Sequence, residues 1–209
     1  DASGFSDGTL SYKGNKDLTW ETQTAFNIGV DFGLFKNKLN GSIEYFSRKS
    51  SDMLYYKPVA GSLGYTQIPM NVGSMTNSGL EIDLNYNILN TKNITWDFNV
   101  NATFIKNKIN ELHPDLNGKL IDGTTIYEEG YSMYRLYLPE WAGVDPENGD
   151  ALWYYNVTDD KGNVTGREKT NDYTIAQQSS NRIATDDMMP TVYGGFGTTI
   201  NAYGFDLSV

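Results

Sequence analysis

The sequence contains no cysteine, which excludes a disulfide, a thiol nucleophile and a cysteine-ligated metal. Basic residues are scarce, because 16 Lys and Arg stand against 26 Asp and Glu and give a formal net charge of −10. This balance argues against a nucleic-acid partner, since neutralising phosphates requires a basic face. No apolar run approaches the length of a membrane-spanning helix.

Catalytic side chains are scarce as well. The single histidine, His113, falls in a predicted loop, and the chain has no G-x-S-x-G nucleophile elbow. The adjacent carboxylates Glu128–Glu129 and Asp186–Asp187 also fall in predicted loops, where such pairs are normally solvated charge. The sequence therefore predicts a protein that is not an enzyme and that has no catalytic cofactor.

The sequence is rich in short alternating runs. From Thr22 to Leu34, apolar residues at even positions alternate with polar or small residues at odd positions. Such a period of two is typical of a strand with two unlike faces, and the frequent aromatic residues and glycines suit an all-β protein with tight turns. Further runs of this kind predict antiparallel strands near 22–35, 39–55, 78–89, 94–106, 191–202 and 205–209.

Short and long connections alternate along the chain. Tight turns are predicted at 35–38, 90–93 and 202–204, and long loops near 49–77 and 106–189. In an up-and-down sheet, this order places every tight turn at one end and every long loop at the other. Outer-membrane barrels have this asymmetry, although a soluble β-sandwich can also show it.

The apolar rows therefore have two possible environments. In a transmembrane barrel they face lipid, and the length of the first strand suits a tilted membrane span. In a soluble β-sandwich, such as a carbohydrate-binding or adhesin module, they meet one another in a core. The residues predicted to face lipid in the barrel are Phe26, Ile28, Val30, Phe32, Leu34, Leu84, Phe98 and Val100.

Aromatic residues in the second long loop are candidates for ligand or partner contact, because exposed rings stack on sugars and anchor protein partners. The alternative is that these rings pack the loop against itself. The candidate contact residues are Tyr131, Tyr134, Tyr137, Trp141, Trp153, Tyr154 and Tyr155.

The same loop contains a weak calcium candidate. In the segment DPENGD (145–150), Asp145, Asn148 and Asp150 bring several oxygen donors into one turn. The pattern lacks the alternating acids and distal Glu of an EF-hand loop. A turn directed by Pro and Gly is the alternative explanation.

Four segments, in order along the chain, carry a family resemblance. They are GNKDLTWETQTAFNIGVDFGLFKNKLNGSIEYFSRKSSDML (14–54), NVGSMTNSGLEIDL (71–84), WAGVDPENGDALWY (141–154) and MPTVYGGFGTTINAYGFDLSV (189–209). Each motif is loose alone, but the order and spacing agree across nearly the whole chain. Together they resemble the SusC/RagA-like family of TonB-dependent outer-membrane transporters.

The resemblance implies an all-β fold in which about six strands belong to an antiparallel, up-and-down transmembrane barrel of 22 strands with a plug in its lumen. The abrupt beginning and end of the chain lead us to expect a piece from the C-terminal part of such a barrel, without the plug domain.

The resemblance also implies a location and partners. The location is the outer membrane of a Gram-negative bacterium, with the tight turns facing the periplasm. The partners are a SusD-like surface lipoprotein, outer-membrane lipid, and TonB through the missing N-terminal part. The imported solute is an oligosaccharide or a peptide.

Overall fold

The computed structural model describes residues 4–6, 9–12 and 14–209. The chain divides into two compact units, which are described separately below. None of the helices in these described ranges has the length and apolar character required to cross a membrane.

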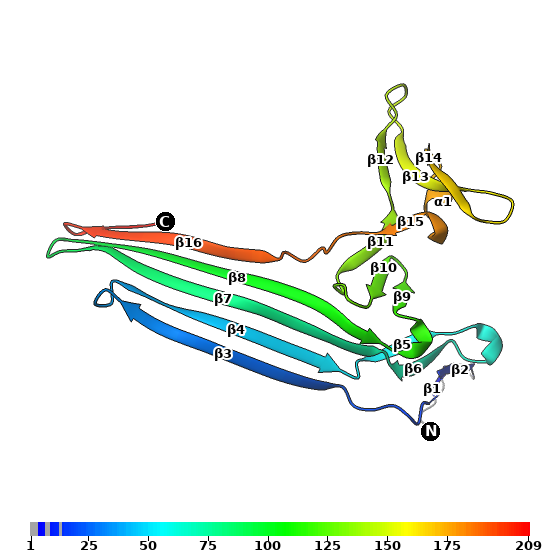
Figure 1. The fold of residues 1–209 in the computed structure, drawn as a ribbon, viewed down its shortest axis with the longest axis horizontal. Coiled ribbons are helices and arrows are strands. Elements are labelled where there is room, and N and C mark those ends of the chain that lie inside the picture. Colours follow the sequence, from blue (N-terminus) through cyan, green and yellow to red (C-terminus); the bar gives the residue numbers. More distant parts are fainter. Residues whose placement is uncertain (1–3, 7–8, 13) are drawn as a thin grey trace. The chain divides into compact units, whose positions relative to one another are not determined.

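The first unit comprises residues 1–118, 129–131 and 190–209. It is built on a six-stranded antiparallel sheet with the order β17-β16-β8-β7-β4-β3, whose long strands run side by side in Figure 1. The sheet is open rather than closed into a barrel, and its up-and-down order confirms the predicted fold class. The strands are β3 (Thr22–Leu34), β4 (Leu39–Ser51), β7 (Gly73–Asn90), β8 (Ile94–Leu112), β16 (Val192–Ala202) and β17 (Phe205–Ser208).

The strand register brings the alternating apolar positions onto one face of this sheet. One row of cross-strand neighbours reads Ile28, Tyr45, Leu80, Phe104 and Val192. Because successive side chains point to opposite faces, every second residue before and after this row shares its face. The polar residues between them lie on the other face. We call these the apolar face and the polar face.

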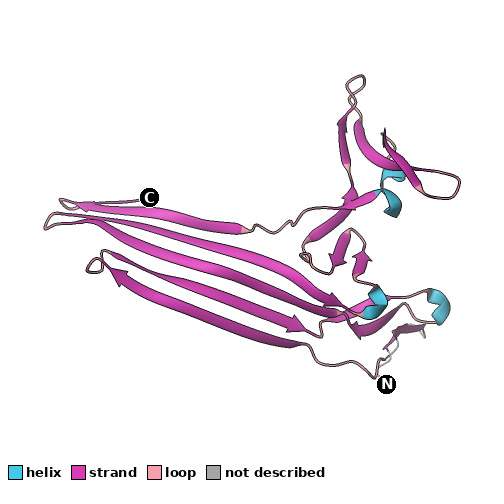
Figure 2. Ribbon diagram, viewed as in Figure 1, coloured by secondary structure: helices cyan, strands magenta, loops and turns pink. Residues whose placement is uncertain are grey.

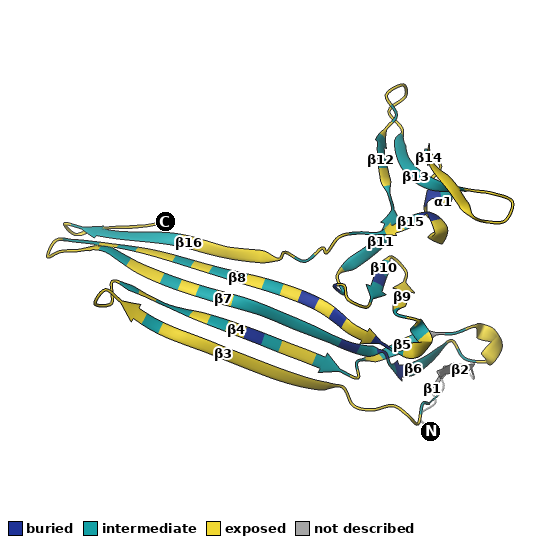
Figure 3. Ribbon diagram, in the orientation of Figure 1, coloured by how far each residue is buried: buried dark blue, intermediate teal, exposed yellow. Residues whose placement is uncertain are grey.

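The apolar face is uncovered. On β3, Phe26 is 56% exposed, Ile28 59% and Val30 64%, and Figure 3 colours this strand as exposed along nearly its whole length. A soluble β-sandwich would bury such side chains beneath a second sheet. The exposure therefore favours the barrel over the sandwich.

Two of the tight turns rely on left-handed backbone. Phe35, Lys36 and Asn37 have φ values of 53°, 58° and 63°, and in the two-residue turn between β16 and β17, Tyr203 and Gly204 have φ values of 50° and 87°. At Tyr203–Gly204, positive φ at both central residues is the type I′ geometry, whose twist matches that of the flanking strands. These turns thereby help to fix the register of the strands that they join.

Some strand ends differ from the predicted ones. β7 begins at Gly73 rather than near residue 78, and β8 continues to Leu112 rather than ending near 106. These extensions are largely polar on both faces, so alternation gave no signal there. The predicted strand 39–55 is divided, because β4 ends at Ser51, Asp52 has a φ of 56°, and Leu54 begins a strand of another sheet.

The connection predicted as a loop near 49–77 contains part of this smaller sheet. Its order is β1-β2-β6-β5, with β2 parallel to β6 and the other pairs antiparallel. The strands are β1 (Gly4–Ser6), β2 (Thr9–Tyr12), β5 (Leu54–Pro58) and β6 (Gln67–Asn71), and the first unit also holds the short helices η1 (Gly61–Leu63) and η2 (Pro114–Leu116).

The second unit, residues 119–128 and 132–189, shows that the predicted loop 106–189 is largely structured. Figure 2 shows its many short strands, which form one sheet with the order β15-β11-β10-β9 and another with the order β12-β13-β14. Its elements are β9 (Lys119–Asp122), β10 (Thr125–Glu128), β11 (Arg135–Pro139), β12 (Trp141–Val144), β13 (Ala151–Thr158), β14 (Val164–Thr170), α1 (Tyr173–Ala176), η3 (Ser179–Asn181) and β15 (Arg182–Ala184).

Buried apolar side chains are few. Within the part of the chain whose burial is described, they are Phe46, Met70, Val72, Ile109, Leu112, Ile126 and Ala176. Phe46 lies on the polar face of the large sheet, directly opposite Gly79 on β7. The absent side chain of Gly79 leaves room for the Phe46 ring, so the aromatic ring covers the glycine backbone.

We predict that Gly79→Ala destabilises the folded sheet. The added Cβ would clash with the Phe104 carbonyl oxygen and would lie 2.6 Å from the Phe46 ring. Overpacking of this kind typically costs about 1–3 kcal/mol. The measurement is the free energy of unfolding from urea titration. Gly29→Ala is the control, because its Cβ meets nothing closer than 3.6 Å; equal losses in both variants would contradict the prediction.

Candidate functional site

The eight residues predicted to face lipid all lie on the apolar face. A second row across the sheet reads Phe32, Gly41, Leu84, Val100 and Phe196. The rings of Phe98 and Phe196 stack across β8 and β16 with centroids 6.4 Å apart. The result is a continuous apolar surface across all the strands of the large sheet. Five of the eight predicted residues are exposed, whereas Phe32, Leu84 and Val100 are half-buried.

Aromatic side chains gather beside the tight turns of the sheet. Phe35, Tyr203 and Phe205 are largely exposed, and the Trp96 ring nitrogen donates a hydrogen bond to Thr198 Oγ1 (2.8 Å). Trp96 and Tyr203, whose rings have a polar edge, suit the boundary between lipid and water, and Phe35 and Phe205 add apolar area beside them. This grouping is therefore what an aromatic girdle requires.

The polar face carries acids and amides. Glu44 lies opposite Glu81, and Asp83 lies opposite Asn101. Amide groups bond across the strands here, as where Asn107 Nδ2 donates to Asn77 Oδ1 (2.7 Å). Such a face suits contact with water or with polar protein. The two faces of the sheet therefore suit different surroundings.

In the second unit, the structure brings together two of the predicted contact residues. Trp141 on β12 and Trp153 on β13 pack edge to face with centroids 6.1 Å apart. Tyr173 on α1 joins them, with its centroid 5.1 Å from that of Trp153. Trp141 and Tyr173 remain about half exposed. We call these three rings the aromatic cluster.

Tyr173 was absent from the predicted contact residues. Its position depends on α1, whose N-cap is Asp172. The Asp172 carboxylate accepts a hydrogen bond from the Thr174 amide (2.8 Å). Asp at this position is a preferred helix N-cap, so the sequence D-Y-T carried a signal for the turn. Its pairing with Trp153 comes from the fold and had no local signal.

Tyr154 and Tyr155 follow Trp153 on β13 but make different contacts. The guanidinium of Arg167 lies 5.0 Å from the centroid of the Tyr154 ring, and Lys169 Nζ lies 5.7 Å from it. The Tyr155 hydroxyl donates a hydrogen bond to Glu168 Oε2 (3.0 Å), which raises the pKa of Tyr155. Both rings are thus held against β14.

The remaining predicted contact residues do not join this cluster. The Tyr137 hydroxyl donates to the Ser179 carbonyl oxygen (2.8 Å), and Lys119 lies over its ring. Tyr134 is exposed, and Tyr131 belongs to the first unit, where its carbonyl oxygen accepts from the Ile109 amide (2.8 Å). The predicted set is therefore several local arrangements rather than one site.

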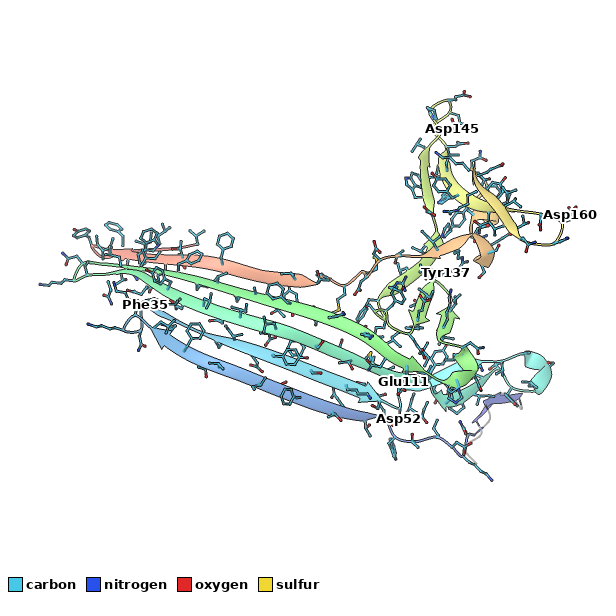
Figure 4. The ribbon with its side chains drawn as sticks, viewed as in Figure 1. Phe35, Asp52, Glu111, Tyr137, Asp145 and Asp160 are labelled. Carbon is cyan, nitrogen blue, oxygen red and sulfur yellow. The ribbon has the colours of Figure 1, made fainter. Side chains whose placement is uncertain are left out.

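The calcium candidate forms the turn between β12 and β13, where Figure 4 labels Asp145 at the hairpin tip. Asp145 Oδ1 accepts from the Glu147 amide, Asn148 Oδ1 accepts from the Asp150 amide, and Asp150 Oδ2 accepts from Asn171 Nδ2. Among the described residues, no group of three or more His, Cys, Asp or Glu side chains is placed to hold a metal ion. Calcium binding here stays a prediction.

The titratable loop residues also have structural contacts. His113 Nδ1 accepts a hydrogen bond from the Asp115 amide (3.3 Å) at the start of η2. Glu128 pairs with Arg135 at 2.9 Å, and Glu129 Oε1 accepts from the Leu112 amide at 2.7 Å. These contacts give His113, Glu128 and Glu129 structural roles.

Comparison with known proteins decides the family. A family model described as "TonB dependent receptor-like, beta-barrel" matches residues 2–209. The chain belongs to this family of β-barrels. TonB-dependent receptor barrels are outer-membrane proteins, and the predicted SusC/RagA-like resemblance is confirmed by the relatives that follow.

Among curated relatives, TonB-dependent receptor SusC of Bacteroides thetaiotaomicron is 36% identical over 99 residues, 47% of this chain and 10% of the relative. TonB-dependent receptor P39 of Formosa agariphila is 34% identical over 124 residues, 59% of this chain and 12% of the relative. The chain thus spans about a tenth of their length. These relatives are named as receptors rather than enzymes, which agrees with the prediction of a non-enzymatic protein.

A solved structure of the RagAB peptide transporter matches over 98% of this chain and 23% of its own, with a TM-score of 0.73 and 30% sequence identity. The RagAB peptide importer in an "open-open" state gives a TM-score of 0.74 at 30% identity, covering 96% of this chain and 21% of its own. This TonB-dependent receptor segment therefore shares both sequence and barrel-wall fold with a known importer.

In this TonB-dependent receptor segment, the first two segments that carry the family resemblance, 14–54 and 71–84, meet in space at Asn71. Its Oδ1 accepts from the Thr19 amide (2.9 Å), and its Nδ2 donates to the carbonyl oxygens of Thr19 (3.0 Å) and Asp52 (2.6 Å). Nearby, Asn15 Nδ2 donates to the Pro69 carbonyl oxygen (3.1 Å). Asn71 thus ties the segment before β3 to the end of β4, a role that the sequence did not reveal.

We predict that Asn71→Ala loosens the segment before β3. The substitution removes Asn71 Oδ1, which accepts from the Thr19 amide, and so removes a hydrogen bond worth about 0.5–1.5 kcal/mol. The Thr19 amide should therefore exchange roughly 2- to 10-fold faster with solvent deuterium. Hydrogen exchange with mass spectrometry measures this. Asn40→Ala is the control, since Asn40 Nδ2 donates to the Asn37 carbonyl oxygen beside the opposite turn. Unchanged Thr19 exchange in Asn71→Ala would refute the role.

Proposed function

We propose that this chain forms part of the barrel wall of a SusC-type, TonB-dependent nutrient importer in the outer membrane of a Gram-negative bacterium. The observation that carries the proposal is the uncovered apolar face of the large sheet. Exposed apolar area in water is unfavourable by roughly 25 cal/mol per Å². Lipid removes that penalty and selects this arrangement of side chains.

The dimensions of the sheet support a membrane span. β3 has 13 residues, β7 has 18 and β8 has 19, whereas a tilted transmembrane strand needs about 9–11. The excess length lies at the end with the long connections, as in barrels whose strands extend beyond the outer leaflet. We accordingly place the tight turns in the periplasm and the second unit outside the cell.

The polar face then lines the lumen. In a barrel of 22 strands this wall would contact water and a plug supplied by another part of the protein. Import would proceed by rearrangement of that plug, powered through TonB, with no bond chemistry in this segment. The solute would be an oligosaccharide or a peptide, captured with a SusD-like lipoprotein. The similarity to SusC and to the RagAB peptide transporter supports this assignment.

The lipid assignment is tested with spin labels on β3. We predict that a label at Ile28→Cys in the full-length transporter collides more with oxygen, which dissolves in lipid, whereas a label at Asn27→Cys collides more with a water-soluble nickel reagent. The reason is that adjacent residues of a strand point to opposite faces. Power-saturation electron paramagnetic resonance measures both collision rates.

The neighbouring positions serve as controls for each other, because they share a strand and a depth. Shielding of position 28 from both reagents would place Ile28 in a protein core. That outcome would overturn the lipid assignment and with it the proposed importer.

We propose the aromatic cluster as the contact for the SusD-like lipoprotein, because its rings pack edge to face while Trp141 and Tyr173 stay about half exposed. We predict that Trp141→Ala lowers the lipoprotein that co-purifies with the full-length transporter about ten-fold, as for the loss of a central aromatic anchor. Val164→Ala on β14 is the control, since Val164 is exposed in the same unit outside the cluster. Equal recovery in both variants would exclude the cluster from the interface.

A further inference from the structure

Lysines follow the apolar rows of the large sheet at the end away from the tight turns. On β4, Tyr45 is followed on the same face by Ser47 and Lys49, and on β8, Phe104 is followed by Lys106 and Lys108. The register connects them, because Lys49 lies opposite Thr76, and Thr76 lies opposite Lys108. We call Lys49, Lys106 and Lys108 the lysine trio.

The three lysines of the trio are close enough for their side chains to reach one phosphate group. Lys106 and Lys108 are two residues apart on one strand, which is roughly 7 Å, and Lys49 lies two strands away from Lys108, roughly 10 Å. The flexible side chains of lysine span such gaps. All three are exposed, and no ion pair joins any of them to a carboxylate within the described part of the chain.

An apolar groove begins where the lysine trio begins. It has a volume of about 260 Å³ and is lined by Tyr45, Leu80, Phe104, Ser78 and Lys106, with Gly79 and Ile105 completing it. Positions 79 and 105 belong to the polar face, so Gly79 and Ile105 contribute backbone atoms to the groove. Lys106 thus belongs both to the groove and to the trio.

The positive charge of the lysine trio is unusual in an acidic chain. The chain carries a formal net charge of −10, and the carboxylates of the neighbouring strand centres, such as Glu44 and Glu81, lie on the polar face. A cationic patch beside an apolar groove on the apolar face suits an anionic partner with an apolar part. Snorkelling, in which a lysine reaches from lipid to the interface, accounts for each side chain singly. It does not account for the grouping, in which Lys106 lines the groove and Lys49 and Lys108 lie beside it on the same face.

We propose that this surface binds a phosphorylated lipid of the outer leaflet, with an acyl chain in the groove and the phosphate between the lysines. The inference rests on the proposed function, because it requires the apolar face to lie in the membrane with this end outward. Basic side chains near a membrane surface attract anionic headgroups. The groove adds an apolar surface along which one acyl chain can lie. The bound lipid would cover Tyr45 and Phe104 and fix the protein's height in the bilayer.

The experiment uses the full-length transporter, delipidated in a neutral detergent and incubated with dioleoyl phosphatidic acid. Lipid retained after size-exclusion chromatography is counted by native mass spectrometry. We expect at least one retained lipid, and a fall of about ten-fold or more in its affinity when Lys49→Gln, Lys106→Gln and Lys108→Gln are combined. Ser78→Phe, which fills the groove and keeps the lysines, should weaken the dioleoyl lipid but not a dihexanoyl analogue.

The matched control combines Lys36→Gln, Lys38→Gln and Lys92→Gln, which removes the same charge from the tight turns. Equal loss in both triple variants would overturn the proposal, because binding would then follow net charge alone. Complete displacement by inorganic phosphate at equal concentration would overturn it too, since the groove would contribute nothing. Failure of the proposed function looks different: the transporter would stay monodisperse when detergent is removed, before any lipid is added.

Discussion

The register of the antiparallel strands is the constraint on which the rest of this structure depends. Side chains alternate strictly along a strand, so a slip of one residue would exchange the two faces of that strand. All strands of the large sheet keep their apolar positions in common rows, from Ile28 across Tyr45 and Leu80 to Phe104. The left-handed residues of the tight turns hold this alignment, and the apolar face, the polar face and the lysine trio all follow from it.

The sequence predicted most of the large sheet because its signal is local. Where one face is apolar and the other polar, alternation locates a strand, and short polar segments such as 35–38 locate the turns. The signal failed beyond residue 106 of β8 and before residue 78 of β7, where both faces are largely polar. There, hydrogen bonding to the neighbouring strand continues without any change in hydropathy.

The second unit was read as a loop for a related reason. Its strands are short, and β9 and β10 have only four residues each, too few for a period of two to stand out. The aromatic residues of this segment could be named from the sequence, but their partners could not. Trp141 meets Trp153 through strand pairing, and Tyr173 reaches Trp153 through a helix that depends on the Asp172 cap. The contacts of Asn71 also join segments that are far apart in the chain.

The scarcity of buried apolar side chains has a consequence for the order of events during synthesis. A water-soluble domain gains most of its folding free energy by enclosing its own apolar groups, but the large sheet encloses almost none. In the proposed barrel, its apolar surface is covered by lipid, which is not part of the protein. For such a chain, adopting the sheet and entering the bilayer are one thermodynamic step, because the sheet has little to hold it together in water. In the proposed barrel, the segment would stay unfolded until that step, with the alternating residues that later meet lipid exposed to aggregation on the way.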